Sequence, residues 1–429
     1  MSWNKVKLGD VCNIEKGTTG ILKAVPGEYP MVVTSEERKS HNEFQFDDEA
    51  VIVPLVSGTG HGHASIKRIH FQKGKFALGS ILCAIIPKDK KQLNAEYLYR
   101  FLDLNKEKEL VARMKGMANV SLPFKEIAQI EIPLPALKDQ LKFVKQYEDL
   151  ESKSNLLSTE LTHQLSLVKK LRQQLLQDAV QGKLVKQNPA DEPASELLKK
   201  IKAEKEKLIA EKKVKKEKEL PPIKLEEIPF DIPDNWVWCR LGEICTKVTD
   251  GFHNTPPKVA SGFPYISATH VKSDNIDWKS CHYVDEKYHR ELYVKTFPQK
   301  GELLIVNIGA GCGTPAIINV DYEFSFKNTA ILKFNQGLVN NKLLYYYFLL
   351  RKEEIYINLT KGGLQPFLSL AILNEIYFPL PPLAEQNRIV QKLDELMQRC
   401  NDLDASIKQS QSQNEKLLQQ VFREALQSK

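Results

Sequence analysis

The sequence has no long hydrophobic run. Its longest uninterrupted apolar stretch, from Leu343 to Leu350, is much shorter than the ~18 residues that a bilayer-spanning helix needs. The amino terminus also lacks an apolar segment followed by a small-residue cleavage site, so it does not have the form of a secretory signal. These absences predict a cytoplasmic protein that does not associate with a membrane.

Cysteine pairs at metal-ligand spacing are absent too. The seven cysteines are scattered and none forms a C-x-x-C pair, which argues against a disulfide framework and a zinc site. His61 and His63 form an H-x-H loop, but no cluster of carboxylates or cysteines accompanies them. We expect reduced thiols, no bound metal, and a polar or DNA-facing loop at the two histidines.

Catalytic signatures are missing as well. The P-loop string G-x-x-x-x-G-K-[ST] does not occur, residues 251–257 contain no Ser or Cys poised beside a base, and the carboxylates are dispersed rather than paired. Residues 254–257 are not the Asn/Asp-Pro-Pro-aromatic loop of an amino-methyltransferase. The glycine-rich stretches 57–62 and 309–313 lack the context of dinucleotide-binding loops. They predict tight loops that approach either another segment or DNA, in a chain without a catalytic site.

The net charge of +7 is weak evidence for nucleic-acid binding, because it is unevenly spread. Between Glu196 and Glu219 there are ten Lys and six Glu, so one short segment carries +4 of the total. A run of mixed charges is typical of a solvated helix. We therefore expect residues 187–234 to form a charged linker whose lysines face water, with phosphate binding by these lysines as the less favoured alternative.

What the sequence does contain is an internal repeat. Residues 133–140, PLPALKDQ, recur as residues 379–386, PLPPLAEQ, and this offset of 246 holds as far as Lys183 and Lys429. Near the start the offset is 233, which pairs Trp3 with Trp236. The chain is therefore two copies of one design, each with a variable globular part followed by a segment of fixed length.

Each fixed-length segment is predicted to be a long helix. Apolar residues from Leu141 to Ala179 recur mostly three, four or seven positions apart, and no proline interrupts them. About 48 residues at ~1.5 Å each give a helix of roughly 70 Å, which is too long to be buried inside a small domain. Two such helices, each with an apolar stripe, are expected to pack together as a coiled coil.

Each globular part is predicted to be an α+β unit. Short β-branched runs bounded by Gly, Pro or Asn are typical of strands, whereas Leu- and Tyr-rich segments near 94–104 and 340–352 have helical spacing. The strand runs lie at 51–53, 80–86, 302–308 and 330–334. The predicted organisation is a globular domain at 1–135, a long helix at 136–186, the linker at 187–234, a second globular domain at 235–381 and a long helix at 382–429.

In this order, the residues resemble the specificity subunit of type I restriction-modification enzymes. The resemblance rests on Trp3 with Leu8-Gly9-Asp10, which are repeated as Trp236 with Leu241-Gly242-Glu243. It also rests on the two Pro-Leu-Pro motifs that open the long helices, and on residues 178–185 followed by 191–194. Together these motifs cover essentially the whole chain.

The resemblance implies two target-recognition domains, each reading one half of a bipartite double-stranded DNA site. It implies an antiparallel pair of long helices that sets the spacer and docks two methylation subunits. Because the copies differ in sequence, the two half-sites should differ. It also implies restriction subunits in the full complex, with S-adenosylmethionine, ATP and Mg bound by the partner subunits and none by this chain. The chain would then not be an enzyme itself, within a holoenzyme that is an adenine-N6 DNA methyltransferase and ATP-dependent endonuclease.

Base recognition needs hydrogen-bonding and cationic side chains on loops. The candidates in the first copy are Thr18, Thr19, Ser35, His61, His63, Lys67, Arg68 and Lys115. Those in the second copy are Thr255, Thr269, His270, Lys272, Asn307, Lys327, Asn328 and Lys361. The first copy has Gly17-Thr18-Thr19-Gly20 where the second has a Thr-Pro turn, so its first loop departs from the pattern.

Two other functions remain as alternatives. One is a coiled-coil scaffold for protein interactions without DNA specificity, and the other is a self-sufficient nuclease or methyltransferase. Only DNA recognition predicts an affinity that falls steeply with salt and discriminates among duplexes. Only a self-sufficient enzyme predicts turnover by the isolated chain.

Overall fold

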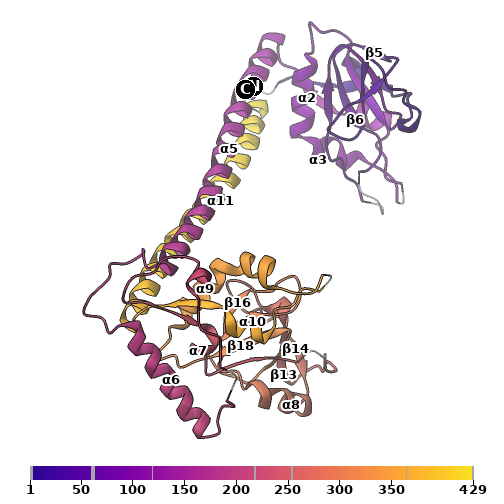
Figure 1. Cartoon of the computed structure of the whole chain (residues 1–429). Helices are drawn as coiled ribbons and strands as arrows, with labels where there is room; N and C mark the ends of the chain where they lie inside the picture. The colour runs from indigo at the N-terminus through magenta and orange to yellow at the C-terminus, as the bar shows by residue number, and fades with distance from the viewer. Residues whose placement is uncertain are drawn as a thin grey trace. The chain divides into compact units, whose positions relative to one another are not determined.

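Figure 1 shows the computed structural model of the chain, which describes residues 3–58, 63–117, 119–216, 219–252, 255–363 and 365–427. The chain forms two compact units, Met1–Gln164 with Ser406–Lys429 and Leu165–Ala405, here called unit 1 and unit 2. Within the described ranges, none of the helices combines the length and apolar character needed to span a membrane.

The globular part of unit 1 is built on two layers of sheet and a ribbon. The ribbon pairs β1 (Lys5–Lys7) with β10 (Glu131–Pro133) and so joins the beginning of the globular part to its end. The central sheet is antiparallel, with the strand order β2 (Cys12–Lys16), β9 (Leu82–Pro87), β6 (Ala50–Pro54), β7 (His70–Gln72). The second sheet has the order β4 (Lys39–His41), β3 (Tyr29–Val32), β8 (Lys75–Leu78), β5 (Phe46–Asp47), with β3 and β8 parallel.

Helices cover the face of the central sheet that is turned away from the second sheet. β6 is apolar throughout because both of its faces are buried. Val51 and Val53 pack in one core cluster with Leu98 of a helix, whereas Ile52 packs in another cluster with the second sheet. The helical segments of the globular part are α1 (Leu8–Val11), η1 (Ile21–Lys23), α2 (Ala95–Leu104), α3 (Lys106–Glu109), η2 (Val111–Arg113) and α4 (Phe124–Ala128).

Unit 2 repeats this arrangement. Its ribbon pairs β11 (Val237–Arg240) with β19 (Tyr377–Leu380). Its central sheet has the order β12 (Lys247–Asp250), β18 (Thr329–Lys333), β15 (Leu303–Val306), β16 (Pro315–Ile317). Its second sheet has the order β14 (His282–Val284), β13 (Phe263–Ser267), β17 (Ser325–Lys327), again with one parallel pair, β13 and β17. The α+β class is therefore confirmed, and each predicted strand run overlaps an observed strand.

The helical segments of unit 2 surround the same sheets. The Leu- and Tyr-rich segment forms α9, whose Leu343 and Phe348 pack with Ile305 of the central sheet. The helical segments of this globular part are α7 (Leu241–Ile244), η4 (Ala268–His270), α8 (Glu286–Thr296), α9 (Asn341–Glu354), the π-helical η5 (Ile355–Leu359) and α10 (Leu370–Glu375).

The glutamine of the repeated PLP motif ties each long helix to its globular part. Gln140 is fully buried, and its Nε2 donates to Gln92 O and Pro135 O at 2.8 Å while its Oε1 accepts from Asn94 N. Gln386 is also fully buried and makes equivalent bonds. Its Nε2 donates to Pro381 O at 3.0 Å, and its Oε1 accepts from Asn340 N–H at 2.8 Å. Asn94 and Asn340 cap α2 and α9. The motif is therefore a structural joint that satisfies backbone groups at a helix start.

The long helices α5 (Leu137–Val180) and α11 (Leu383–Gln427) lie side by side in Figure 1. In unit 1, Gln411 Nε2 lies 3.4 Å from Thr162 Oγ1, and the buried Asn414 donates to Ser158 Oγ at 3.0 Å. In unit 2, Arg172 Nη2 donates to Asn401 Oδ1 at 2.8 Å. The partner number falls as the α5 number rises, so the helices run antiparallel.

The expected apolar stripe on α5 is only partly correct. Val144, Leu161 and Val168 are buried, but Leu141, Leu150 and Leu157, which have the same spacing, are exposed. Spacing alone does not distinguish a seam residue from a neighbour that lies at the rim of the stripe. These three leucines therefore do not contribute to a buried seam.

The expectation of a solvated linker is only partly correct for its helix, because most of its lysines are exposed but one apolar face is buried. α6 (Ala194–Ala210) buries Ala194, Leu197 and Ile201 in the main core of unit 2. Lys202 pairs with Glu243 at 2.7 Å on the rim of this contact. The spacing of three and four residues places these apolar side chains on one face, which the surrounding lysines obscure in the sequence. The helix is thus part of the domain that follows it.

Candidate nucleic-acid interface

Several strand ends of unit 1 meet at one edge of the central sheet. β2 and β6 both pair antiparallel with β9, so they run in the same direction and end beside the start of β9. β7 runs antiparallel to β6 and begins at this edge. Gly79, which precedes β9, donates its N–H to Val32 O at 3.0 Å. The end of β3 therefore lies at this edge as well. We call this edge, with the loops that leave it, the loop edge.

A short hairpin is fixed beside the loop edge of unit 1. The backbones of Lys115 and Ser121 exchange hydrogen bonds of 2.7 and 2.9 Å, and Ser57 N–H donates to Val120 O at 2.9 Å. Gly116 has φ +123°, and a Cβ there would lie 2.3 Å from Asn119 O. Only glycine fits this turn. The base of the hairpin is therefore fixed beside Ser57, where the glycine-rich loop that follows β6 begins.

Unit 2 has an equivalent loop edge and hairpin. β12 and β15 both pair antiparallel with β18, so their ends meet at its start. The backbones of Lys361 and Phe367 exchange hydrogen bonds of 2.9 and 2.8 Å, and Gly309 N–H donates to Pro366 O at 2.8 Å. Gly362 has φ +86°. Both hairpins thus connect to the glycine-rich loop in the same way, at the offset of 246 that the sequence shows.

The candidates in unit 1 all belong to loops of its loop edge, apart from His61, which lies outside the described residues. Those that are exposed are Thr18, Ser35, His63, Lys67 and Lys115, whereas Thr19 and Arg68 are half-buried. Several have partners inside the protein. Lys115 Nζ pairs with Glu126 at 2.5 Å and Arg68 with Glu36 at 2.9 Å. Thr18 bonds Gln45 Oε1 at 3.0 Å through both its N–H and its hydroxyl.

The candidates in unit 2 also gather at its loop edge, but they differ in accessibility. Those that are exposed are Thr255, Thr269, Lys272 and Lys361, whereas Lys327 and Asn328 are half-buried and His270 and Asn307 are buried. Lys327 Nζ donates to Thr255 Oγ1. Asn328 has φ +57°, the left-handed conformation that asparagine tolerates, between β17 and β18.

The two buried candidates have different surroundings. His270 Nδ1 accepts from Ser267 N–H at 3.0 Å and its Nε2 donates to Ser280 O at 3.1 Å, so both ring nitrogens are occupied inside the domain. Asn307 Oδ1, by contrast, is buried without a hydrogen-bond partner among the described atoms. An unpaired buried acceptor of this kind costs stability. Asn307 thus shares this unsatisfied state with Thr329 Oγ1, which is buried at the start of β18 on the same edge.

Sequence analysis missed one pair of polar residues at this edge. Asn119 and Gln365 lie at equivalent positions of the two hairpin tips, and both are exposed. Side-chain amides are suited to bidentate contacts with adenine. The offset of 246 that pairs Lys115 with Lys361 also pairs these two amides, so the internal repeat could have identified them as candidates.

One group in unit 2, with a buried histidine and serine and a half-exposed glutamate, has the composition of a catalytic triad. His289 Nδ1 lies 2.9 Å from Ser325 Oγ, and its Nε2 lies 3.2 Å from Glu323 Oε2. Ser325 is 1% exposed, so no substrate reaches its hydroxyl. Burial lowers the pKa of His289. The group fastens α8 to the second sheet. Among the described residues, no group of three or more His, Cys, Asp or Glu side chains is placed to hold a metal ion.

A buried histidine near the loop edge makes unit 1 sensitive to acid. Burial, with Arg38 and Arg68 nearby, lowers the pKa of His70 to about 4, and its Nδ1 lies 3.1 Å from Arg38 Nη1. Because the folded state resists protonation that the unfolded state accepts below pH ~6.5, stability is lost as pH falls from there toward 4. We expect unit 1 to lose up to about 3 kcal/mol over this range. Thermal unfolding at pH 7 and 4.5 should show a smaller loss for His70→Gln, and equal losses would contradict this account.

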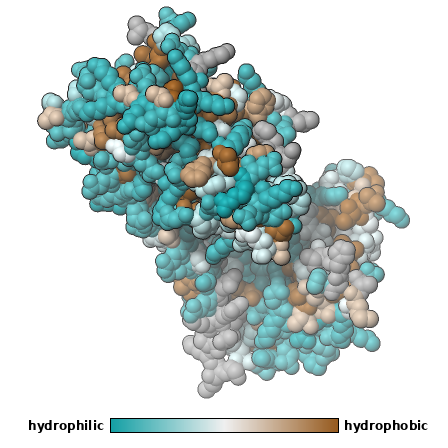
Figure 2. Space-filling model, turned by 90° about the horizontal axis from the view of Figure 1, so that it is seen from below, coloured by the Kyte–Doolittle hydropathy of each residue, from teal (hydrophilic) through white to brown (hydrophobic). Residues whose placement is uncertain are grey.

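The surface face in Figure 2 is mostly hydrophilic, with apolar residues scattered singly or in small groups. Scattered residues of this kind are normal on a folded protein. On this face, polar recognition is a better description than a broad apolar interface.

Comparisons with known proteins agree with this architecture. Residues 1–167 and 233–410 match a family model described as the type I restriction modification DNA specificity domain. The Escherichia coli type I restriction enzyme EcoAI specificity subunit is 32% identical over 245 residues, covering 56% of this chain and 41% of that relative. The Escherichia coli EcoDI specificity subunit is 23% identical over 450 residues, covering 99% and 88%. The match thus spans about two fifths of the EcoAI relative, and likewise 42% of the EcoEI relative.

Solved structures share the fold. The HsdS subunit from Thermoanaerobacter tengcongensis has a TM-score of 0.55 at 17% identity, over 99% of this chain and 96% of that chain. A chain from a structure titled as the basis of complex assembly and conformational transition of the type I R-M system has a TM-score of 0.67 at 16% identity, over 100% and 98%.

Proposed function

Because the chain belongs to the type I restriction-modification DNA specificity family, we propose that it is the sequence-recognition subunit of such a complex. Each globular part reads one half of a bipartite duplex site, and the chain performs no catalysis itself. The comparisons do not favour the alternative of a protein-interaction scaffold without DNA specificity.

The observation that carries this proposal is the repeated loop edge. In both units, a hairpin that begins with lysine and carries an amide at its tip is hydrogen-bonded to the loop after the middle strand of the central sheet. Lysines contact phosphates and set the position of a protein on DNA, while amides discriminate among bases. Lys115 with Asn119 and Lys361 with Gln365 provide this combination once in each copy.

The two long helices are suited to fix the distance between the two half-sites. We infer that α5 and α11 form an antiparallel coiled coil, so that the two copies meet DNA in opposite orientations and the helix length sets the unread spacer. The polar Asn414 within this seam supports a fixed register, because its amide bonds Ser154 O at 2.9 Å as well as Ser158 Oγ. Since the loop-edge residues differ between the copies, the two half-sites are expected to differ.

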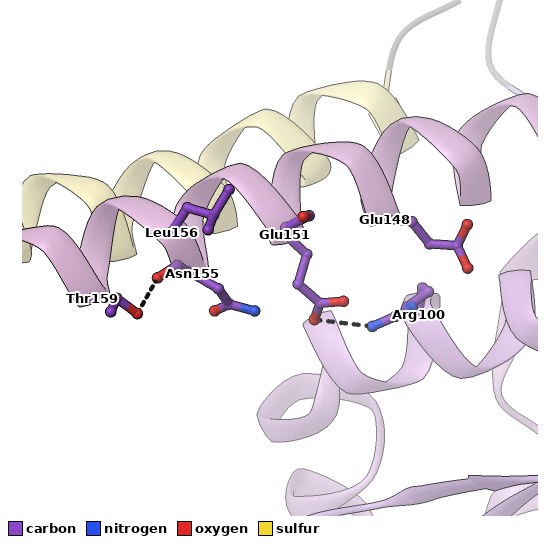
Figure 3. Close-up of a pocket in the computed structure, with 7 residues that line it drawn as sticks. Arg100, Glu148, Glu151, Asn155, Leu156 and Thr159 are labelled. Carbon is purple, nitrogen blue, oxygen red and sulfur yellow. Dashed lines mark hydrogen bonds and ion pairs between the residues drawn. The ribbon is translucent and has the colours of Figure 1, made fainter.

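We further propose that α5 docks a methylation subunit. Figure 3 shows a groove between α2 and α5, lined by Arg100, Glu148, Glu151, Ser152, Asn155, Leu156 and Thr159. Arg100 bonds Glu151 at 3.1 Å across it. Leu156 is 69% exposed at its border, with Leu150 and Leu157 also exposed nearby. Two methylation subunits and, in the full complex, restriction subunits are the proposed partners. They would bind S-adenosylmethionine, ATP and Mg, and this chain none of them.

Leu156→Asp should abolish co-purification of methylation subunits with the chain, because the new charge would be buried without a partner at the interface. Thermal unfolding of the chain alone should be unchanged, since the side chain is exposed. The matched control is Val294→Asp, at a 78% exposed position on α8, which should leave assembly intact. Normal assembly of the Leu156→Asp variant would show that this groove is not the docking site.

The function is tested by mapping methylated adenines in cells with and without the gene. We expect a two-part methylated motif that disappears on deletion and returns on complementation. If the pattern is the same in both strains while the partner subunits are expressed, the proposed function is wrong.

A further inference from the structure

The two most exposed large apolar side chains among the described residues both lie on the loop edge of unit 1. Leu22 is 100% exposed and Met117 is 95% exposed, followed by Val294 at 78%. Single exposed apolar residues need no explanation. Here, however, the two highest values coincide with the edge that carries the polar DNA-binding candidates.

Both side chains stand on well-fixed supports. Leu22 belongs to a turn that is closed by a bond of 2.9 Å from Lys23 N–H to Gly20 O. The preceding Gly17 is pressed against the sheet edge, because a Cβ there would lie 2.3 Å from Gly79 O. Met117 stands at the tip of the hairpin that Lys115 and Ser121 close. Neither apolar group therefore depends on a partner to position its backbone.

The two supports are joined across the edge by backbone hydrogen bonds of 2.9 Å. Ser80 N–H donates to Thr19 O, and Ile81 O accepts from Leu55 N–H. Leu55 O in turn accepts from Leu122 N–H beside the hairpin. Because the chain of bonds is continuous, the backbone segments that carry Leu22 and Met117 are held at the same edge of unit 1.

Unit 2 has no apolar side chain at the hairpin position equivalent to Met117. The offset of 246 places Gly363 where unit 1 has Met117. Like unit 1, its hairpin has an exposed lysine and an exposed amide, Lys361 and Gln365, and Phe367 at the base of the hairpin is 41% exposed. The two copies therefore present different chemistry on the same scaffold, which is what the recognition of unlike half-sites requires.

We propose that Leu22 and Met117 read thymine in the half-site bound by unit 1, by packing against its 5-methyl group. This inference rests on the proposed function. The 5-methyl of thymine is the apolar group that an unmodified duplex displays on its base edges in the major groove. Lys23 and Lys115, next to or close to the two apolar residues, are placed to hold the flanking phosphates. Unit 2, with glycine at the equivalent tip, recognises its half-site without needing this methyl group.

The test uses the full chain with its methylation subunits and duplexes that contain the motif found by methylation mapping. Thymines of one half-site at a time are replaced by uracil, which removes only the methyl group. We expect affinity to fall about 3- to 5-fold for each contacted methyl in the unit 1 half-site. Uracil in the other half-site should have no effect. In the double variant Leu22→Ala/Met117→Ala, the response to uracil should disappear.

Ile357→Ala serves as the control, because Ile357 is 74% exposed but belongs to unit 2, and it should keep the wild-type response. Met117→Gln, which keeps the side-chain size, should behave like Met117→Ala. The inference is wrong if uracil in the unit 1 half-site is harmless to the wild-type complex, or if the alanine variants respond as the wild type does. A wild-type complex that binds all duplexes equally would overturn the proposed function itself.

Discussion

Lys361→Glu weakens sequence-specific DNA binding by about 10- to 100-fold at ~0.1 M salt, because a phosphate contact is replaced by repulsion. The loss should be nearly uniform across sequences, and the slope of affinity against salt should decrease by roughly 1. Lys361 is exposed, and its backbone bonds to Phe367 hold it at the start of the hairpin. Fluorescence anisotropy with the assembled complex at several salt concentrations measures both effects.

Lys287→Glu is the matched control. Lys287 is exposed on α8, which begins just after Val284. Val284 pairs with Phe263, at the end of β13 that is opposite to the loop edge. Lys287 therefore belongs to a segment that starts away from the loop edge. The variant has the same change in net charge but should keep wild-type affinity to within about twofold. If Lys287→Glu weakened binding as much as Lys361→Glu, the effect would come from overall charge, and the loop edge would not be the interface.

Gln386→Leu destabilises unit 2 by about 3 kcal/mol, because it leaves the Asn340 N–H and Pro381 O without their partner in a buried place. For a unit of this size, that corresponds to a fall of roughly 6–10 °C in the unfolding temperature. Gln140→Leu should have a comparable effect on unit 1. Differential scanning calorimetry of the full chain measures both.

The control for this prediction is Gln391→Leu, an exposed position on the same helix. It should change stability by less than about 0.5 kcal/mol. Equal stability of Gln386→Leu and Gln391→Leu would show that the repeated glutamine does not connect the helix to the globular part.

The repeat made much of the fold predictable. The offset of 246 identified the two long helices, and short β-branched runs located strands such as β6 and β15. These signals are local, because the spacing of apolar residues within one segment indicates whether that segment forms a helix or a strand. The spacing did not show that Leu150 and Leu157 are exposed, because that depends on where the second helix lies. Lysines likewise hid the buried face of α6.

The candidate site was predictable in composition but not in arrangement. The residue types of Lys115 and Thr255, together with their place in predicted loops, predict that they contact DNA. Their convergence depends on the order β2-β9-β6-β7 and its equivalent in unit 2, and this pairing is non-local. The burial of His270 followed from contacts with Ser267 and Ser280 that its sequence context does not indicate. The sequence does not predict Leu22 and Met117 as contact residues, because the sequence of an apolar residue does not show whether its side chain is buried or exposed.

The central claim is that each globular part reads one half of the site independently. The most direct measurement is adenine-methylation mapping in cells that carry a chimera in which residues 5–133, from β1 to β10, are replaced by the equivalent part of a relative with a known motif. We predict that one half of the methylated motif changes to that of the relative, while the other half and the spacer length stay the same. An unchanged motif, or a change in both halves from this single exchange, would contradict the account.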